Sequence, residues 1–521
     1  MVLAFSVGME KNVVMQGMSD PNPELLDAMA MCGHLVARDS VHWFLAEHRQ
    51  RLFPDDMFAD LFASGRGRPS VPADVIATVM VLQALDNLSD REAINQLRNS
   101  ISWKVAAGRS LADEGFHPTV LTLWRNKLRG SDRPQRIFDA VREVIDATKV
   151  LSGKTRRALD STVLDDAVTR QDAIMQLVAQ IRRVRRLVPA AKALELVAHD
   201  YDHDTGKPVC AWNDRADIDR VVTELVNDAR MILDALDGHV LNDAQTEAVG
   251  MLSLVAGQDV EPGDTEGTWR IAQVTRPDRM VSVHDPESRH VHKTTSNYRD
   301  GFKAHIGIEP DTGLITACAL TAGNVGDAQA APGLLAAETD PVEVLADSAY
   351  GSGGFRNHLA QHSHTATIKP IPLQPAIPGG FTIDDFTLNM TAATITCPNG
   401  ITTRISARGN ATFGTKCRGC PLRERCTTAT GGRHVFVNEH HDLLAAARAH
   451  AHTPEFKIPY RQHRPMVERS IAWLVRNGGR KVRYRGINRN QIGLAHRCAA
   501  INLRRLINLG TTWDNGWTIT N

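Results

Sequence analysis

The sequence predicts an α/β protein in which a mixed sheet is interrupted by a helical segment. Short apolar runs bounded by turn residues are typical of strands, and they occur at 156–164, 269–274, 280–283, 301–308, 314–321 and 342–345. Residues 169–256 repeat apolar side chains at helical spacing instead, which predicts a helical insertion. A hairpin-type turn at 309–313 joins two of the runs, so part of the sheet should be antiparallel.

Length and composition are those of an ordinary globular protein. The 521 residues, 42% apolar and 23% charged, suit two to four domains. The sequence contains no run of about 18 uncharged apolar residues, and its N-terminus lacks a basic segment followed by an apolar one. We therefore expect a cytoplasmic protein with no membrane partner.

The N-terminal region, residues 40–144, is predicted to be helical. Its final helix, 119–128, carries Arg125 and Lys127. A compact helical domain with a basic last helix is typical of helix-turn-helix DNA binding. A helical bundle without that role would show the same pattern.

Three acids are predicted to sit on regular elements far apart in sequence. Asp160 lies inside one strand-like run, Asp347 follows another, and Glu468 lies on an amphipathic helix. Carboxylates are the hard ligands that Mg²⁺ or Mn²⁺ prefers, and a pair of such ions about 4 Å apart catalyses phosphodiester displacement. Each acid also has a structural alternative: Asp160 as a turn cap, Asp347 bonded to its own loop, and Glu468 paired with Arg464 or Arg469.

The segment 457–505 is strongly basic, with Glu468 as its single acid. Its cations are Lys457, Arg461, Arg464, Arg469, Arg476, Arg480, Lys481, Arg483, Arg485, Arg489, Arg497, Arg504 and Arg505. This pattern indicates a surface that binds a polyanion. The alternative is a solvated helix face, although such faces usually interleave Glu with Lys and Arg.

Four of the eight cysteines cluster in sequence. Cys397 precedes a Cys-x-x-Cys pair, Cys417 and Cys420, and Cys426 follows. Four thiolates suffice for a closed tetrahedral zinc site, which would be structural because it leaves no open position. Unligated thiols or a redox pair are the alternatives.

Four histidines, His284, His290, His292 and His305, lie among basic residues. We expect them in polar loops that contact phosphate, rather than as metal ligands.

Several motifs together resemble the bacterial insertion-sequence transposases of the DDE class, of the insertion sequence eleven-eighty-two type. The motifs are Ala158-Leu-Asp-Ser-Thr162, Asp285-Pro-Glu-Ser-Arg-His290, Gly301-Phe-Lys-Ala-His305, Gly323-Asn-Val-Gly-Asp327, Ala346-Asp-Ser-Ala-Tyr-Gly351, Arg464-Pro-Met-Val-Glu-Arg469, Asn477-Gly-Gly-Arg480 and the cysteine run. The helical region adds Gly67-Arg-Pro69, Leu88-Ser-Asp-Arg-Glu92 and Gly115-Phe-His-Pro118. The resemblance extends from about Val41 to Leu506 and implies an RNase H-like core.

By this resemblance Asp160, Asp347 and Glu468 are catalytic and bind two Mg²⁺ (or Mn²⁺) ions. The expected activity is binding of the inverted-repeat ends, followed by metal-dependent strand cleavage and strand transfer into target DNA. The resemblance implies double-stranded DNA as partner, a homodimer in the synaptic complex and association with the nucleoid. The expected DNA-binding residues are Tyr460, Arg464, Arg469, Arg476, Arg480, Lys481, Arg483, Arg485, Arg125 and Lys127.

Two other functions fit part of the pattern. A domesticated or inactive descendant would bind DNA without cutting it. A zinc-ribbon transcription regulator would use the cysteines and basic helices but would leave the acids without a role.

The predicted organisation has seven parts. They are a tail at 1–40, a helical DNA-binding domain at 41–150, a core in two pieces at 151–168 and 269–370, a helical insertion at 169–268, a β-rich insertion with the cysteines at 371–440, C-terminal core helices with the basic segment at 441–510, and a tail at 511–521.

Overall fold

The computed structural model describes residues 15–20, 25–62, 67–274, 276, 278–292 and 298–520. Parts of the expected N-terminal tail, residues 1–14 and 21–24, lie outside the described residues. Within the described ranges, no helix is both long and apolar enough to cross a bilayer.

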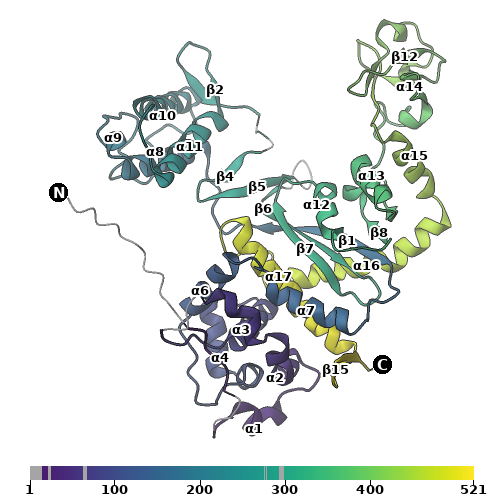
Figure 1. The fold of residues 1–521 in the computed structure, drawn as a ribbon. Coiled ribbons are helices and arrows are strands. Elements are labelled where there is room, and N and C mark those ends of the chain that lie inside the picture. The colour runs from purple at the N-terminus through teal and green to yellow at the C-terminus, as the bar shows by residue number, and fades with distance from the viewer. Residues whose placement is uncertain are drawn as a thin grey trace.

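A seven-stranded mixed sheet forms the centre of the molecule (Figure 1). Its strands are β1 (Arg156–Asp165), β4 (Met280–Ser282), β5 (Asp285–His292), β6 (Tyr298–Ile308), β7 (Ile315–Ala322), β8 (Glu343–Ala346) and β9 (Thr365–Ile368). Their order is β4-β5-β6-β1-β8-β9, and β7 also pairs with β6. The pairs β1–β6 and β6–β7 are antiparallel, whereas β1–β8 and β8–β9 are parallel. The protein is therefore of the mixed α/β class, as predicted.

Helices cover both faces of this sheet. Leu159 and Val344 pack in one cluster with side chains of α12 (Asp327–Leu335) and α13 (Gly353–Gln361). The neighbouring residues Ala158 and Leu345 face the opposite side, where they join the cluster formed with α16 (Pro454–Leu474) and α17 (Ile487–Asn508). This alternation follows from the two-residue period of a strand.

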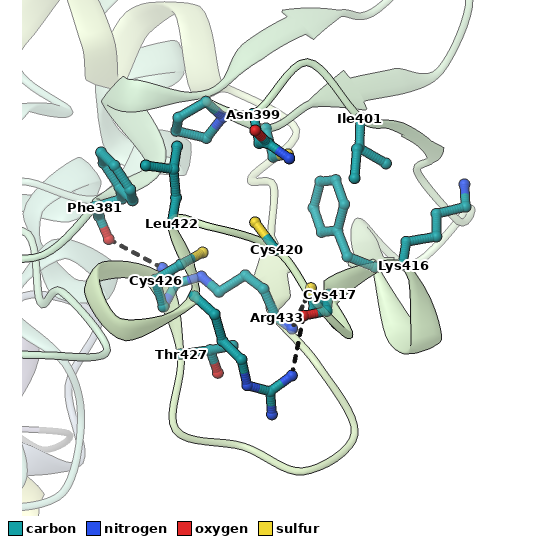
Figure 2. Close-up of a pocket in the computed structure, with 14 residues that line it drawn as sticks. Phe381, Asn399, Ile401, Lys416, Cys417, Cys420, Leu422, Cys426, Thr427 and Arg433 are labelled. Carbon is teal, nitrogen blue, oxygen red and sulfur yellow. Dashed lines mark hydrogen bonds between the residues drawn. The ribbon is translucent and has the colours of Figure 1, made fainter.

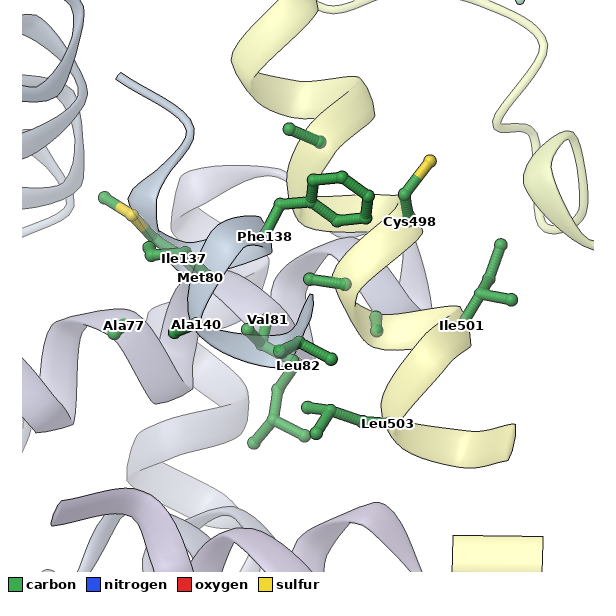
Figure 3. Close-up of a cluster of buried hydrophobic side chains, with 14 of the residues drawn as sticks. Ala77, Met80, Val81, Leu82, Ile137, Phe138, Ala140, Cys498, Ile501 and Leu503 are labelled. Carbon is green, nitrogen blue, oxygen red and sulfur yellow. The ribbon is translucent and has the colours of Figure 1, made fainter. Parts of the chain in front are cut away.

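The N-terminal region is all helical. Its helices are α1 (Ala28–Cys32), α2 (Val41–Leu52), α3 (Ala73–Asp86), α4 (Asp90–Asn99), α5 (Ile101–Ala107), α6 (Thr119–Arg129) and α7 (Arg136–Ala147). Figure 3 shows α3 and α7 beside α17, with Phe138 of α7 and Leu503 of α17 pointing into the space between the helices. The helical region and the sheet therefore share one hydrophobic core, joined by α17.

Two excursions project from the core (Figure 1). The first contains α8 (Ala173–Leu187), α9 (Pro189–Lys192), α10 (Arg215–Ala235), α11 (Asp243–Gln258), β2 (Val260–Pro262) and β3 (Trp269–Ile271), and it has its own apolar cluster. The second contains β10 (Thr387–Asn389), β11 (Thr394–Thr396), β12 (Thr402–Arg404), β13 (Asn410–Thr412), α14 (Arg423–Cys426) and β14 (His434–Phe436), and α15 (His441–His450) leads back from it.

The expected C-terminal tail, 511–521, contains a hairpin of β15 (Thr511–Trp513) and β16 (Trp517–Ile519), and Trp517 stacks on Phe44 of α2 with ring centroids 5.7 Å apart. Packing against an aromatic partner can order a terminal segment that local sequence leaves undefined.

The prediction that four histidines lie in polar loops was wrong for the three positions that lie in strands. His290 and His292 belong to β5 and His305 to β6. His290 Nδ1 lies 2.5 Å from Asp300 Oδ1, and the fully buried His305 contacts Thr321 Oγ1 through Nε2 at 2.9 Å. Each of these two rings has a polar partner on a neighbouring strand inside the sheet, so His290 and His305 are not phosphate-facing loop residues.

Candidate active site

Strand register places Asp160 beside Asp347. In the parallel pair β1–β8, Ala158 is opposite Leu345. Two residues further along each chain stand Asp160, still in β1, and Asp347, just after β8. Because side chains two apart in a strand share a face, both carboxylates point to the face covered by α16.

Helix α16 supplies the other groups from one of its faces. Arg464 and Glu468 are four residues apart, so they lie one turn from each other. The helix runs through Pro459 and Pro465 without ending. Pro465 therefore neither begins nor terminates the segment that carries Glu468.

The guanidinium of Arg464 contacts all three carboxylates. Its Nη2 lies 3.1 Å from Asp160 Oδ1, and its Nη1 donates to Asp160 Oδ2 at 3.2 Å. Nη2 is also 3.9 Å from Asp347 Oδ2, and Nη1 is 3.9 Å from Glu468 Oε1. One cation thus gathers acids from β1, the end of β8 and α16.

The site is graded from buried to exposed. The side chains of Arg464 and Asp160 are 6% and 14% exposed, whereas those of Asp347 and Glu468 are 45% and 65% exposed. Burial raises the pKa of Asp160, and Arg464 opposes that rise. Burial works against the charge of Arg464, but Asp160, together with Tyr460 and Asp347, raises the pKa of the guanidinium above its ordinary value. The carboxylates are therefore held around fixed positive charge.

Each aspartate also has a local backbone partner. Asp160 Oδ1 accepts from the amide of Ser161 at 2.9 Å, and Asp347 Oδ1 accepts from the amide of Ala349 at 2.9 Å. The second bond caps a short 3₁₀ turn, Ser348–Tyr350. These bonds limit the rotation of both carboxylates.

The donor set suits a hard divalent cation. Three carboxylates supply oxygen ligands only, and they already surround a positive group. Among the described residues, no group of three or more His, Cys, Asp or Glu side chains is arranged to hold a metal ion. The chemistry of the donors fits Mg²⁺ or Mn²⁺, whereas their present arrangement is organised around Arg464.

Two tyrosines flank the acids. Tyr460 stacks on Phe456 with ring centroids 5.3 Å apart, and burial raises its pKa while Arg464, one turn away, lowers it. Tyr350 is fully buried, and its hydroxyl has no hydrogen-bond partner within the described structure. Burial raises its pKa well above the usual range, with further contributions from Asp327 and Asp160.

Sequence reasoning assigned no role to Tyr350 or to a nearby ion pair. Lys303 Nζ lies 2.9 Å from Asp327 Oδ1, and the same Nζ donates to the carbonyl of Val325 at 2.8 Å. Lys303, Asp327 and Tyr350 all belong to motifs that carried the family resemblance. That resemblance was the available signal, but no local pattern indicated that the three positions are close in space.

The basic helix α6 turns its predicted contact residues inward. Arg125 forms a salt bridge with Asp90, and its guanidinium lies 5.0 Å from the ring centroid of Tyr484. Lys127 Nζ donates to the carbonyl of Leu61 at 2.7 Å. Both cations therefore have partners within the chain.

The basic C-terminal segment divides into structural and exposed residues. Arg480 donates to Thr162 Oγ1 and to the Val163 carbonyl, both at 3.2 Å, which ties this segment to β1. Arg483 is exposed but donates to the carbonyl of Asn87. The exposed cations that were expected to bind DNA and have no contact described above are Arg469, Arg476, Lys481 and Arg485.

The four cysteines of the second excursion line one small cavity (Figure 2). The cavity has a volume of about 20 Å³, close to the space that one water molecule occupies. Burial raises the pKa of Cys426, and the neighbouring thiols of Cys417, Cys397 and Cys420 raise it further, against the effect of Arg433. The fold thus brings together four thiols that are up to 29 positions apart (397 to 426) in sequence.

Fold and site together define an α/β protein that presents carboxylates from three elements around one arginine at the end of two parallel strands. The sequence matches two family models: residues 396–507 match the model described as Transposase DDE domain, and residues 38–127 match Transposase domain (DUF772). No curated protein and no solved structure matches the chain. The two matches indicate an insertion-sequence DDE transposase.

Only some of the candidate site residues lie within the two matched ranges. Glu468 and the four cysteines lie within the DDE-domain match, and Arg125 and Lys127 lie within the other. Asp160 and Asp347 lie outside both. Their place in the site rests on the structure and on the motifs around them.

Proposed function

We propose that this transposase binds the inverted-repeat ends of an insertion sequence and catalyses strand cleavage and strand transfer, with Asp160, Asp347 and Glu468 as its metal-binding acids. The observation that carries the proposal is the single guanidinium within 4 Å of all three carboxylates. Two divalent ions bound there would activate a water or a 3′-hydroxyl and stabilise the leaving oxygen of a phosphodiester. We propose Mg²⁺ or Mn²⁺ because only oxygen ligands are present.

The residues of the chain have distinct tasks in this proposal. Asp160 is the fixed ligand, because β1, the Ser161 amide and Arg464 hold its carboxylate. Asp347 and Glu468 are the more exposed ligands and face the incoming DNA. Arg464 keeps the acids together before metal binds, and afterwards its charge is available to a scissile phosphate.

The sheet supports an RNase H-like core. Taken alone, the strands β1, β6, β7, β8 and β9 lie in the order β7-β6-β1-β8-β9, with the first three antiparallel and the last two parallel to β1. In that arrangement Asp160 lies on the central strand β1, and Asp347 follows directly after its parallel neighbour β8. We propose that this core acts on double-stranded transposon ends and on target DNA, as a homodimer when two ends are paired.

The exposed cations Arg469, Arg476, Lys481 and Arg485 would contact the DNA backbone near the acids. Arg125 and Lys127 are weaker candidates because Arg125 is paired with Asp90 and Lys127 donates to the carbonyl of Leu61. The alternative function, a domesticated protein that binds DNA without cutting it, uses the same cations and differs only in the acids.

The two functions are separated by Glu468→Gln, with Glu439→Gln as its matched control. Both side chains are exposed, by 65% and 83%, so neither substitution should affect folding. Cleavage of a labelled end duplex in Mg²⁺ should fall by about 100-fold or more in Glu468→Gln, because one metal ligand is lost, while duplex binding stays at the wild-type level. Equal cleavage by the two variants would overturn the mechanism, and a wild-type protein that binds ends without cleaving them would favour the domesticated function.

We also propose that the cysteine cavity holds one structural Zn²⁺. Four thiols line it, although they are not arranged as a metal site among the described residues, and the apolar cluster of this excursion contains only seven buried residues, including Cys426. Small units with so little core usually need a metal or a disulfide to stay folded. Cys397, Cys417, Cys420 and Cys426 would be the ligands, and with all four positions filled the ion would have no catalytic role.

A further inference from the structure

The helical excursion borders a large basic cavity that the proposed chemistry does not use. Its volume is about 750 Å³, and it lies between α8, α9 and the loop before α17. Figure 1 shows this excursion beside β4 and β5, close to the first turn of α17. The cationic side chains that line it are Arg182, Arg183, Arg185, Arg186, Lys192 and Arg485.

The cavity has more positive than negative charge. Only two carboxylates are among its lining residues, and each forms a salt bridge: Glu247 with Arg183 at 2.8 Å and Asp202 with Arg185 at 2.9 Å. Arg185 also donates to the carbonyl of Leu194 at 2.9 Å, so it is a structural residue. The other four cations are left without a carboxylate of their own in the lining.

Two of these cations are suited to an external ligand. Arg186 and Lys192 are exposed, and neither forms a salt bridge or side-chain hydrogen bond within the described residues. They lie on α8 and on the adjoining α9. Their ammonium and guanidinium groups can therefore bind an anion without breaking a contact in the protein.

The cavity is linked by the basic segment itself to the end of β1, the strand that carries Asp160. The amide of Val482 donates to the carbonyl of Asp165 at 2.8 Å, so residues 480–482 run alongside the end of β1. The chain then reaches Gly486, whose amide donates to Asp285 at 3.2 Å at the start of β5. The exposed Lys481 and Arg485 thus lie on one continuous segment from the catalytic strand to the cavity.

We propose that this cavity binds the phosphate backbone of double-stranded DNA that continues past the cleavage site. A small apolar ligand does not suit a cavity lined by six Lys and Arg side chains, since small-molecule pockets are mainly apolar. Backbone phosphates suit it because they need several cations and no particular base. The inference rests on the proposed transposase function and names a second DNA contact for it.

The test is the double variant Arg186→Ala with Lys192→Ala, compared with wild type and with Arg215→Ala. Arg215 lies on α10 of the same excursion, outside the cavity lining, and its side chain is 66% exposed. Affinity for a labelled duplex bearing the element end would be measured over a range of salt concentrations. Each lost phosphate contact should lower the slope of log K against log salt by about 0.9, so the double variant should lose about 1.8.

The double variant should also bind about 10- to 60-fold more weakly near 0.1 M salt, with the same loss on an unrelated duplex. An unchanged slope and affinity would overturn the cavity proposal while leaving the catalytic proposal intact, because Glu468→Gln tests the latter through cleavage alone. A loss confined to single-stranded RNA of the same length would overturn it in favour of an RNA site. Melting curves that match wild type would exclude misfolding as the cause of any loss.

Discussion

Arg464 holds Asp160 through two parallel contacts, Nη2 to Oδ1 at 3.1 Å and Nη1 to Oδ2 at 3.2 Å, although the two residues are 304 positions apart in sequence. Both side chains are largely buried. A bidentate pair of this kind fixes orientation as well as charge, and it ties α16 to the central strand. This ion pair therefore stabilises the contact between α16 and β1 as well as forming part of the candidate active site.

The ion pair between Arg464 and Asp160 predicts a large loss of stability for Arg464→Ala. Removing the guanidinium leaves the buried Asp160 without its partner, so the free energy of unfolding should fall by about 3 kcal/mol. Arg464→Lys should recover only part of the loss, since a single ammonium cannot make both contacts. Chemical denaturation would measure it, with Arg461→Ala on the exposed side of α16 as the control. Equal stability of the two alanine variants would show that the Arg464–Asp160 pair does not stabilise the fold.

The four cysteines that line the cavity predict that the purified protein contains zinc. Protein purified without chelator should contain about one zinc per chain, and chelation should lower the melting temperature. Cys420→Ser should abolish both effects. Cys210→Ser, in the other excursion, should abolish neither. A Cys420→Ser protein with full zinc and unchanged stability would refute the site.

At the interface between α3 and the C-terminal segment, the backbone conformation of Asn87 predicts that alanine and glycine at this position will differ in stability. This residue ends α3 with φ of 52°, its side chain donates to the Asn477 carbonyl at 2.7 Å, and its Oδ1 accepts from Arg497 at 3.1 Å. Asn87→Ala should cost about 2 kcal/mol, because it loses these bonds and strains the left-handed backbone. Asn87→Gly should cost about 1 kcal/mol, since glycine accepts that conformation. Thermal unfolding measures both variants, and a higher melting temperature for Asn87→Ala than for Asn87→Gly would contradict this prediction.

His48 predicts a pH dependence of stability. Burial, followed by the charge of Arg51, lowers the pKa of His48 to about 4, and its ring packs edge-on against Trp517 at 5.1 Å. The unfolded state takes up a proton below about pH 6.5, whereas the folded state stays neutral until about pH 4. The stabilising contribution is thus complete above pH 6.5 and is lost as the pH falls toward 4.

Between pH 7 and pH 5, wild type should lose about 1 kcal/mol more stability than His48→Gln, after allowance for partial solvent contact. The exposed His239 provides the control, since His239→Gln should follow wild type. Urea titrations at the two pH values measure the difference. Parallel pH profiles for wild type and His48→Gln would rule out this linkage.

Secondary structure was predictable where the periodicity was local. The apolar run before Asp347 forms β8, and the run around Asp160 forms β1. The strand β5 was missed because Asp285–His292 is polar, and several of its side chains, such as Ser288 and His290, are paired with neighbouring residues. Burial of a polar strand depends on partners that a single-segment pattern does not reveal.

The sequence by itself determined the repertoire: acids on a strand, after a strand and on a helix, a basic C-terminal segment, and four clustered cysteines. Only the tertiary structure decided how these groups are used. It placed Arg464 among the three acids, turned Arg125 toward Asp90, and left Arg186 and Lys192 open to a ligand. The reason is that local periodicity sets which face a side chain takes, whereas charge pairing and burial depend on residues brought together from distant parts of the chain.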